Sequence, residues 1–517
     1  MSDVGPRIAL SGCMLARLQT AALSGVEAIP VSVEVDVGGG LPGMTMVGLP
    51  DTSVRESRER VRSAIRNSGF PFPTGHITVN LAPADVRKIG AAFDLPIALG
   101  ILAAGGVLPH RSKDGPMRDG PIVAGGVSLD GSVPAMRGAL PIAVAAQRAT
   151  PAALLFPAAN LTEAAIVNGV DLFPVRSLFE AAQIFTAHRP QPAVRPRAIA
   201  ETDAFIGDDL SDVAGQLVAR RAIEIAAAGG HHLLLTGPPG AGKTMLARRL
   251  AGVLPPLSAD EALAVTTIHS VAGTLPPGGG LITARPFRAP HHTCSEIALV
   301  GGGSYPRPGE LSLAHHGVLF LDELPEFTRR TLETLRQPLE LGTITIARAV
   351  RSVTFPARVT LVGAMNPCMC GYAGDPRRQC RCTPSAIERY RSRLSGPMRD
   401  RFDLSVEVQA VPWRDLRATT RGESSAVVRA RVIAARARQQ ERDDILNARL
   451  EGAALRRVCR LDVAGERLLA RAMERQLLSA RGATRVLRVA RTIADLANHD
   501  AIVSTDVAEA LQFRVSV

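Results

Sequence analysis

The sequence predicts a multidomain α/β protein, and two patterns support this prediction. Three short apolar runs, at 232–236, 318–321 and 359–364, end in a loop or in polar residues and alternate with helical patterns. Buried strands of this kind are typical of a parallel sheet with helices on its faces. After about residue 424 the strand patterns stop, and the remaining chain predicts only helices. These helices are expected at 426–449, 463–478, 483–499 and 505–513.

A proline-rich segment separates this part of the chain from an N-terminal part. Residues 188–196 contain three prolines, which favour an extended and solvated connection. We therefore expect an N-terminal domain at 1–187, a linker at 188–200, an α/β domain at 201–423 and a helical domain at 424–517.

The N-terminal part alternates β-rich runs with helical patterns, which is typical of an α+β or α/β domain. Residues 29–37 alternate apolar and polar side chains and end at three glycines, which predicts a strand and a turn. Asp51 precedes a helical pattern and can cap that helix. The expected strands are 29–37, 76–81 and 122–129, and the expected helices are 53–67 and 94–104.

The composition is that of a globular protein. The 517 residues are 46% hydrophobic and 21% charged, which excludes disorder as the main state. No run of about 18 apolar residues is free of charges or of Pro and Gly, so we expect no membrane span. The first residues lack a basic stretch followed by an apolar one, so we expect no secretory signal and a cytoplasmic location.

The charge of the chain points to a polyanionic partner. The formal net charge is +12, and residues 385–517 hold 25 arginines against 17 acidic residues. Only three of the 60 basic residues are lysines. Codon bias could explain the preference for arginine over lysine, but it does not explain the excess of base over acid. A concentrated basic excess favours a nucleic acid partner.

The most specific motif is a phosphate-binding loop that follows a predicted strand and precedes a predicted helix at 245–254. Its glycines allow backbone N–H groups to surround phosphates at a helix N-terminus. Lys243 is expected to reach the β- and γ-phosphates of ATP, and Thr244 is expected to bind Mg²⁺. The predicted nucleotide-binding residues are Gly237, Pro238, Pro239, Gly240, Ala241, Gly242, Lys243 and Thr244.

Two further strands end in residues that suit nucleotide hydrolysis. The apolar run 318–321 is followed by Asp322 and Glu323, which is a Walker B pattern. Asp322 is expected to support Mg²⁺, and Glu323 is expected to polarise the attacking water. Asn366 follows the third strand and could orient that water, although a turn residue before Pro367 is an alternative.

Two arginines are candidates for contacts with the γ-phosphate. Arg401 is expected to act on the nucleotide of a neighbouring subunit, and Arg485 opens a helix near the C-terminus. Because the chain is rich in arginine, a solvated surface position is the alternative for each.

Four of the seven cysteines lie within fifteen residues. Cys368, Cys370, Cys380 and Cys382 form two C-x-C pairs, which could supply four thiolates to Zn²⁺. A redox pair or unligated cysteines are the alternatives. The other three cysteines, Cys13, Cys294 and Cys459, are expected in the core.

Two segments have a weaker functional signal. His291 and His292 lie between the Walker strands, where a His pair could bind a metal. We expect a structural or loop role instead, because neighbours on an extended chain point to opposite sides. Residues 342–355 predict a hairpin with Arg348 and Arg351 near its tip. These arginines could grip a DNA backbone in the pore of a ring, or they are ordinary surface arginines on an edge.

These motifs together resemble the ComM/YifB family, within the Mg-chelatase-like AAA+ ATPases. The resemblance implies a hexameric, DNA-binding ATPase and helicase that drives branch migration of recombination intermediates in natural transformation, with a recombinase as a further partner. It also implies that Arg401 is the arginine finger and that Arg485 is the second sensor. Besides the phosphate loop, the matching stretches are 48–64, 79–85, 93–98, 285–293, 307–310 and 491–496.

The N-terminal domain resembles the Lon-protease-like fold, also described as ribosomal protein S5 domain 2-like. The positions of the Lon serine and lysine fall near Ala92 and Leu140, neither of which can act as a nucleophile or a base. We therefore expect a non-proteolytic domain that binds DNA or organises the ring. The AAA+ domain carries the P-loop, and the C-terminal helices are expected to form its lid.

Two other functions compete with a DNA motor. One is a Mg-chelatase-type AAA+ motor that remodels a protein partner, and the other is an ATP-dependent protease. The extra N-terminal domain and the basic C-terminal part argue against the first, and the missing Ser–Lys pair argues against the second.

Overall fold

The computed structural model describes most of the chain, as two compact units. The first unit comprises residues up to 200 together with 266–281, and the second comprises 201–265 and 282–517. The expected linker at 188–200 lies outside the described residues except for positions 192–193. The described ranges are 15–88, 90–108, 120–186, 192–193, 209–276, 278–303, 305–348, 351–375, 378–413, 422–475 and 478–514.

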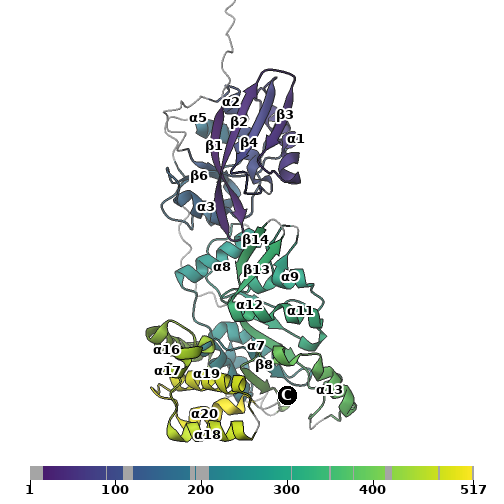
Figure 1. Ribbon diagram of the computed structural model, residues 1–517, viewed down its shortest axis with the longest axis vertical. Helices are drawn as coiled ribbons and strands as arrows, with labels where there is room; N and C mark the ends of the chain where they lie inside the picture. The colour runs from purple at the N-terminus through teal and green to yellow at the C-terminus, as the bar shows by residue number, and fades with distance from the viewer. Residues whose placement is uncertain are drawn as a thin grey trace, which may run out of the picture. The chain divides into compact units, whose positions relative to one another are not determined.

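The first unit is built on a mixed seven-stranded sheet (Figure 1). The sheet has the order β3-β4-β2-β1-β5-β6-β7, and only the pairs β1–β2 and β2–β4 are antiparallel. The mixed sheet agrees with the α/β or α+β prediction for this part of the chain. Its strands are β1 (Ala16–Ser24), β2 (Glu27–Gly38), β3 (Gly43–Val47), β4 (His76–Ala82), β5 (Ile122–Val123), β6 (Ala153–Pro157) and β7 (Asp171–Val175).

The predicted strand at 122–129 is wrong beyond its first two residues. Only Ile122 and Val123 pair with their neighbours, and the chain then turns at Gly125, where φ is +155°. The residues that follow are largely buried, so the apolar pattern reflects burial in a loop and not a longer strand. An apolar run alone cannot distinguish these two cases.

Helix α2 forms the centre of the first unit. All eleven of its residues are buried, which explains why its sequence is apolar on every side. Its first residue, Asp94, is fully buried and accepts hydrogen bonds from Arg60 Nε at 2.9 Å and Nη2 at 3.1 Å. The helices of this unit are α1 (Thr52–Asn67), α2 (Asp94–Ala104), α3 (Ala139–Gln147), α4 (Leu161–Ala164) and α5 (Leu178–Thr186).

The first unit also includes the end of a helix from the second half of the chain. Helix α8 (Ala259–Ala272) carries Ser270, whose hydroxyl donates to the buried carboxylate of Glu163 at 2.5 Å. The same carboxylate accepts a hydrogen bond from the backbone N–H of Leu140 at 3.0 Å. The sequence did not predict that residues 266–281 belong to the first unit.

The second unit contains a five-stranded sheet in which every pair is parallel, as predicted. The strand order is β16-β8-β15-β12-β9, so the first strand along the chain lies inside the sheet. Because parallel strands all point the same way, the sheet has one edge of carboxyl ends and one edge of amino ends. The strands are β8 (Leu233–Thr236), β9 (Phe287–Arg288), β12 (Val318–Leu321), β15 (Thr360–Met365) and β16 (Leu404–Glu407).

Short elements surround this sheet. Helices α6 (Leu217–Gly229) and α7 (Lys243–Val253) pack on it, and β13 (Thr343–Arg348) with β14 (Arg351–Pro356) forms the predicted hairpin. The remaining elements are α9 (Glu296–Val300), β10 (Gly301–Gly302), β11 (Arg307–Pro308), α10 (Glu310–Leu313), α11 (Arg329–Thr334), α12 (Arg336–Leu341), α13 (Pro384–Ser392) and α14 (Gly396–Arg399). The 3₁₀ helices of both units are η1 (Ala91–Phe93), η2 (Ala158–Asn160), η3 (Leu210–Asp212), η4 (Leu324–Glu326) and η5 (Asn447–Arg449).

The C-terminal helices share a hydrophobic core with the sheet. Buried residues of α6, α7, β8 and β16 lie in one cluster with residues of the C-terminal helices, which Figure 1 draws in yellow and yellow-green. These helices are α16 (Ser425–Asp443), α17 (Gly452–Val458), α18 (Val463–Glu474), α19 (Ala480–Leu496) and α20 (Ser504–Gln512). Among the described helices, none is both long and apolar enough to cross a membrane.

A buried ionic cluster joins the C-terminal helices. Asp495 on α19 is paired with Arg491, at 2.9 Å, and with Arg442 on α16, at 3.0 Å. Asn447 donates to the same carboxylate at 2.7 Å. Both Asp495 and Arg491 are almost fully buried.

Replacement of Asp495 is therefore expected to destabilise the fold. In Asp495→Ala the guanidinium of Arg491 stays buried without its counter-charge, which costs about 3–5 kcal/mol. Urea unfolding of the full chain, followed by circular dichroism, measures this change. Glu451→Ala is the control, because it removes an exposed partner of Arg488 and should cost at most about 1 kcal/mol. Equal effects of the two variants would contradict the prediction.

Candidate nucleotide-binding and hydrolysis site

The phosphate-binding loop lies between β8 and α7, as predicted. The strand ends at Thr236, and the helix begins at Lys243 after a glycine, Gly242, with φ of +92°. Gly237 has to be a glycine, because a Cβ there would lie 2.1 Å from the carbonyl oxygen of Val408. The sequence therefore fixes both the entry of the loop and the start of its helix.

Lys243 is held at the centre of this loop. Its side chain is largely buried, and Nζ donates to the carbonyl oxygens of Gly237 at 2.6 Å and Pro238 at 2.9 Å. Burial lowers the pKa of Lys243, and the nearby carboxylates of Asp322 and Glu323 oppose this shift. The ammonium is thus fixed where the backbone N–H groups of the loop can surround a phosphate.

The predicted Walker residues lie together at the carboxyl edge of the sheet. Thr244 Oγ1 donates to Asp322 Oδ2 at 2.8 Å, which brings together a hydroxyl and a carboxylate that suit Mg²⁺. Asn366 follows β15, and its Oδ1 accepts a hydrogen bond from Lys243 Nζ at 3.0 Å. This contact places the Asn366 side chain beside the phosphate-binding loop.

Glu323 has the geometry of a functional residue. Its backbone adopts a left-handed conformation, with φ of +51°, which is uncommon for a residue other than glycine. Its side chain is exposed, and Oε2 lies 3.2 Å from Nδ1 of His292. A strained backbone that presents an exposed carboxylate is typical of catalytic positions.

His292 is a site residue that the sequence analysis missed. The assignment of a structural role assumed an extended segment, but the chain turns at His292, and the rings of His291 and His292 lie 4.1 Å apart. The premise that the two side chains point to opposite sides is therefore wrong. The position of this pair between the two Walker strands was the signal that could have identified it.

The two predicted arginines lie at the other edge of the sheet. Arg401 and Arg485 line a cavity of about 1030 Å³. This cavity is bordered by residues that immediately precede strands, such as His232 before β8 and Asp403 before β16. Among its described lining residues, none belongs to the phosphate-binding loop. The arginines are therefore separated from their own phosphate-binding loop by the length of the sheet.

Neither arginine is a freely solvated surface residue. The side chain of Arg401 is 15% exposed and contacts Glu340 at 2.5 Å, and its Nε is buried without a hydrogen-bond partner among the described residues. Arg485 is 9% exposed and lies 3.2 Å from Asp400. Both therefore hold defined positions on the cavity wall.

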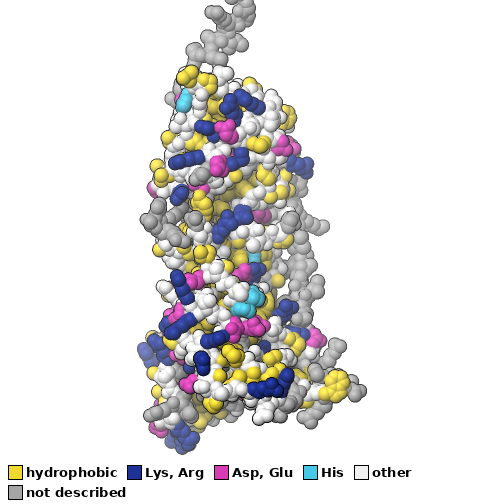
Figure 2. Space-filling view, turned by 90° about the vertical axis from the view of Figure 1, so that its right-hand side faces the viewer, with side chains coloured by type: hydrophobic (Ala, Val, Ile, Leu, Met, Phe, Trp, Pro, Cys, Tyr) yellow, Lys and Arg dark blue, Asp and Glu magenta, His cyan; other side chains and the backbone are white. Residues whose placement is uncertain are grey.

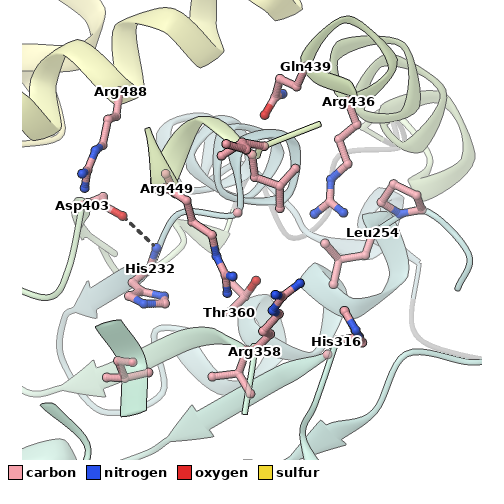
Figure 3. Close-up of a pocket in the computed structure, with 18 of the residues that line it drawn as sticks. His232, Leu254, His316, Arg358, Thr360, Asp403, Arg436, Gln439, Arg449 and Arg488 are labelled. Atoms are coloured by element: carbon pink, nitrogen blue, oxygen red, sulfur yellow. Dashed lines mark hydrogen bonds between the residues drawn. The ribbon is translucent and has the colours of Figure 1, made fainter. Parts of the chain in front are cut away.

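Other basic groups line the same cavity (Figure 3). Arg358 and Arg449 point toward each other, and burial together with Arg358 lowers the pKa of Arg449. Burial also lowers the pKa of Arg436, to about 9, and that of His232, to about 4. Among the described residues, the cavity is thus lined by eight arginines and six acidic residues, together with an uncharged imidazole at His232.

The four cysteines lie close together in the structure. Their Sγ atoms are all within 4.8 Å of one another, with 3.3 Å between Cys368 and Cys370 and 3.5 Å between Cys370 and Cys380. A tetrahedral Zn²⁺ site with bonds of about 2.3 Å places its sulfurs about 3.8 Å apart. A hydrogen bond from the backbone N–H of Arg381 lowers the pKa of Cys370 to about 6, whereas burial and the neighbouring sulfurs raise the pKa of Cys380 to about 12 and also raise that of Cys382. The donor set therefore fits a soft divalent metal.

The remaining residues that the sequence singled out are the three other cysteines and the two hairpin arginines. Cys459 is buried, and burial raises the pKa of its thiol to about 12, whereas Cys294 is partly buried against the core. Cys13 lies outside the described residues, as do the side chains of Arg348 and Arg351. The backbone pairing Arg348↔Arg351 places both arginines next to the hairpin tip, as predicted.

The sequence of this chain is similar to known protein families and to individual known proteins. The chain matches three family descriptions: "Magnesium chelatase, subunit ChlI" over 209–416, "Subunit ChlI of Mg-chelatase" over 33–160, and "Magnesium chelatase, subunit ChlI C-terminal" over 422–514. It is 45% identical over 510 residues to the uncharacterized protein YifB of Salmonella typhimurium, with 97% of each chain covered. It is 44% identical over 508 residues to the competence protein ComM of Haemophilus influenzae, with 97% of this chain and 98% of the relative covered. The chain belongs to the YifB/ComM family.

A more distant relative belongs to the chelatases. The chain is 28% identical over 192 residues to the magnesium-chelatase 38 kDa subunit of Rhodobacter capsulatus, with 34% of this chain and 48% of the relative covered. The YifB/ComM chain is therefore an ATPase of the Mg-chelatase-like AAA+ type, with ATP and Mg²⁺ as the ligands that its family suggests. Lys243, with Asn366 beside it, is suited to hold the phosphates of ATP. Thr244 and Asp322 are suited to hold Mg²⁺.

The contact between His292 and Glu323 gives a prediction for catalysis. We expect His292→Ala to lower kcat for ATP by up to about fivefold, because Glu323 loses a partly exposed contact worth at most about 1 kcal/mol that orients its carboxylate. The Kd for ATP should change less than twofold, since His292 does not contact the phosphate-binding loop. A steady-state ATPase assay and a nucleotide-binding titration measure the two quantities.

His291→Ala provides the control, because the ring of His291 contacts Thr293 and not Glu323. It should keep kcat within twofold of the wild type. An unchanged kcat in His292→Ala would show that Glu323 needs no support from this imidazole.

Proposed function

We propose that this protein is an ATP-driven DNA motor that assembles as a homo-hexamer and acts as a helicase in branch migration of recombination intermediates during natural transformation. The observation that carries the proposal of an assembly is the separation of the Walker residues from Arg401 and Arg485. The proposal of a DNA substrate is supported by the likeness to competence protein ComM and by the basic excess of the chain.

The separation argues that the site is completed by a second subunit. Strands β8 and β15 run from one edge to the other and are four and six residues long, which corresponds to about 13–20 Å. Arg401 does not line the space around its own phosphate-binding loop, yet it is held in a defined position. A head-to-tail contact between copies would bring one copy's amino edge to the next copy's carboxyl edge, and such contacts close into rings.

In this arrangement each residue has a separate task in hydrolysis. Lys243 and the N–H groups of the loop hold the phosphates, and Glu323 takes a proton from the attacking water while Asn366 helps to orient it. Mg²⁺, when bound by Thr244 and Asp322, would neutralise charge on the β- and γ-phosphates. Arg401 and Arg485 of a neighbouring copy would stabilise the charge that develops on the transferred group.

Contacts with DNA are proposed for the hairpin and the C-terminal part. Arg348 and Arg351 adjoin the tip of the β13–β14 hairpin, where they could contact phosphates in the pore of a ring. On the face that Figure 2 shows, basic side chains are interspersed with acidic ones. The C-terminal part is proposed because residues 385–517 hold an excess of arginine over acidic residues. We propose that the N-terminal domain is non-proteolytic and binds DNA or organises the ring.

We also propose that the cysteine quartet binds Zn²⁺. Cys368, Cys370, Cys380 and Cys382 would supply four thiolates to a structural site, in which no open position is needed. Their preformed spacing supports this assignment over a redox pair, because three different sulfur pairs lie at similar distances.

A second candidate function is a Mg-chelatase-type motor that remodels a protein partner. The match to the Rhodobacter capsulatus chelatase subunit favours it. Such a motor needs no DNA, whereas a branch-migration motor should hydrolyse ATP faster on its substrate. The response of ATPase activity to DNA therefore separates the two functions.

The first test is the ATPase rate with and without a four-way DNA junction, together with strand exchange on a gel. We expect the junction to raise the rate at least several-fold and ATP to drive branch movement. Glu323→Gln should lose both activities while it still binds ATP, because only the activation of water is removed. ATPase activity that ignores every DNA tested would favour a protein partner.

The second test examines whether Arg401 acts on a neighbouring copy. Lys243→Ala and Arg401→Ala should each be inactive, because one lacks nucleotide binding and the other lacks the arginine for its neighbour. In a random one-to-one mixture, about a quarter of head-to-tail interfaces combine an intact loop with an intact arginine. We therefore expect the mixture to regain a measurable ATPase rate. A mixture that stays inactive, although the two variants co-assemble, would contradict action between copies.

A further inference from the structure

The cysteine loop contacts the phosphate-binding loop. Gly371, between the first two cysteines and the last two, is buried, and a Cβ there would lie 2.6 Å from Cδ and 2.8 Å from Cγ of Pro239. Pro239 is the third residue of the phosphate-binding loop. Segments 132 residues apart in sequence thus approach so closely that only a glycine fits between them.

The cysteine loop follows Asn366 directly in the chain. Asn366 is followed by Pro367 and Cys368, and Cys368 is fully buried. Arg391 on α13 donates to the carbonyl oxygen of Pro367 at 3.3 Å, and the hydroxyl of Tyr390 accepts a hydrogen bond from the backbone N–H of Asn366. The chain is therefore anchored immediately before the first cysteine.

Beyond that anchor, the loop is linked by the cysteines and by Arg378, which donates to the hydroxyl of Tyr372 at 2.7 Å. The described part of residues 368–382 forms no helix or strand. The Sγ of Cys368 accepts a hydrogen bond from the N–H of Ala373 at 3.3 Å, and that of Cys380 accepts one from the N–H of Cys382 at 3.4 Å. Cys368 and Cys370 lie at one end of the loop, and Cys380 and Cys382 lie at the other. A bound metal would therefore hold both ends of the loop together.

We propose that metal binding at the cysteine quartet and nucleotide binding at the phosphate loop strengthen each other. The metal holds Gly371 against Pro239 and fixes the backbone that carries Asn366, whose side chain bonds Lys243. A nucleotide that orders the phosphate loop in turn favours the closed cysteine loop. This inference rests on the proposed Zn²⁺ site and adds a regulatory link between that site and ATP.

The coupling requires equal effects in both directions, since linkage between two binding equilibria is reciprocal. Removal of zinc should weaken ADP binding about 5- to 150-fold, the usual range for coupled sites. ADP should raise the affinity for zinc by the same factor. Zinc content by elemental analysis, ADP binding by calorimetry, and competition of EDTA for zinc with and without ADP measure these quantities.

A pair of glycine variants separates the contact from general damage to the loop. Gly371 and Gly374 have similar backbone conformations, with φ of +87° and +80°, so alanine strains both alike. A Cβ at Gly374 meets nothing within 4 Å, whereas one at Gly371 meets Pro239. We expect Gly371→Ala to keep its zinc but to bind ADP at least fivefold more weakly. Gly374→Ala should keep both properties.

The outcomes distinguish this proposal from the others. Protein without zinc after purification and reloading would overturn both the metal site and the coupling, but it would leave the DNA motor untouched. Bound zinc with an ADP affinity that changes neither on metal removal nor in Gly371→Ala would overturn the coupling alone. If metal-free protein unfolds, the glycine pair still decides the question, because both variants are measured with their zinc bound.

Discussion

A parallel sheet has two chemically different edges, and this constraint governs the second unit. Lys243, Asp322 and Asn366 follow the carboxyl ends of their strands, whereas Arg401 precedes the amino end of another. No change of rotamer can bring a side chain from one edge to the other, because the backbone direction fixes which edge each loop joins. The proposed contact of the two arginines with a nucleotide at the carboxyl edge therefore requires a second copy of the chain.

Helix α19 connects the arginine cavity to the interior of the unit. It carries Arg485 near its start, and it carries Thr492 two turns later, whose hydroxyl lies 2.7 Å from Nε2 of His231. His231 in turn lies 3.4 Å from Asp403, which precedes β16. All of these groups are buried, so they fix the position of α19 against the residues that precede β8 and β16.

The sequence correctly predicts those elements whose residue pattern fits only one local structure. The phosphate-binding loop, the strand before Asp322 and the fully apolar helix α2 are confirmed, because in each a local pattern leaves little choice of structure. The predicted strand at 122–129 failed since burial alone produced its pattern. The contact of His292 with Glu323 depends on a turn that no local signal announces.

Long-range contacts were beyond the reach of the sequence for a different reason. The approach of Gly371 to Pro239 and the packing of residues 266–281 with the first unit join segments that are far apart in the chain. Neither segment carries a pattern that refers to its partner. Similarly, Arg358 and Arg449 look like ordinary arginines until the fold places them on one cavity wall.

The scarcity of lysine shows which positions resist replacement by arginine. The two lysines in the described residues, Lys88 and Lys243, are both buried, and each Nζ donates to two backbone carbonyl oxygens. A compact ammonium fits such a group of carbonyls, whereas a planar guanidinium needs more space and a forked partner. In a chain with three lysines among 60 basic residues, lysine thus persists where the backbone geometry demands a point charge. The carbonyl groups that accept from Lys243 belong to the phosphate-binding loop. Those that accept from Lys88 belong to Gly48 and Pro83 in the first unit. The same steric argument explains why arginine could replace lysine on exposed surfaces, where the shape of the cation is not restricted.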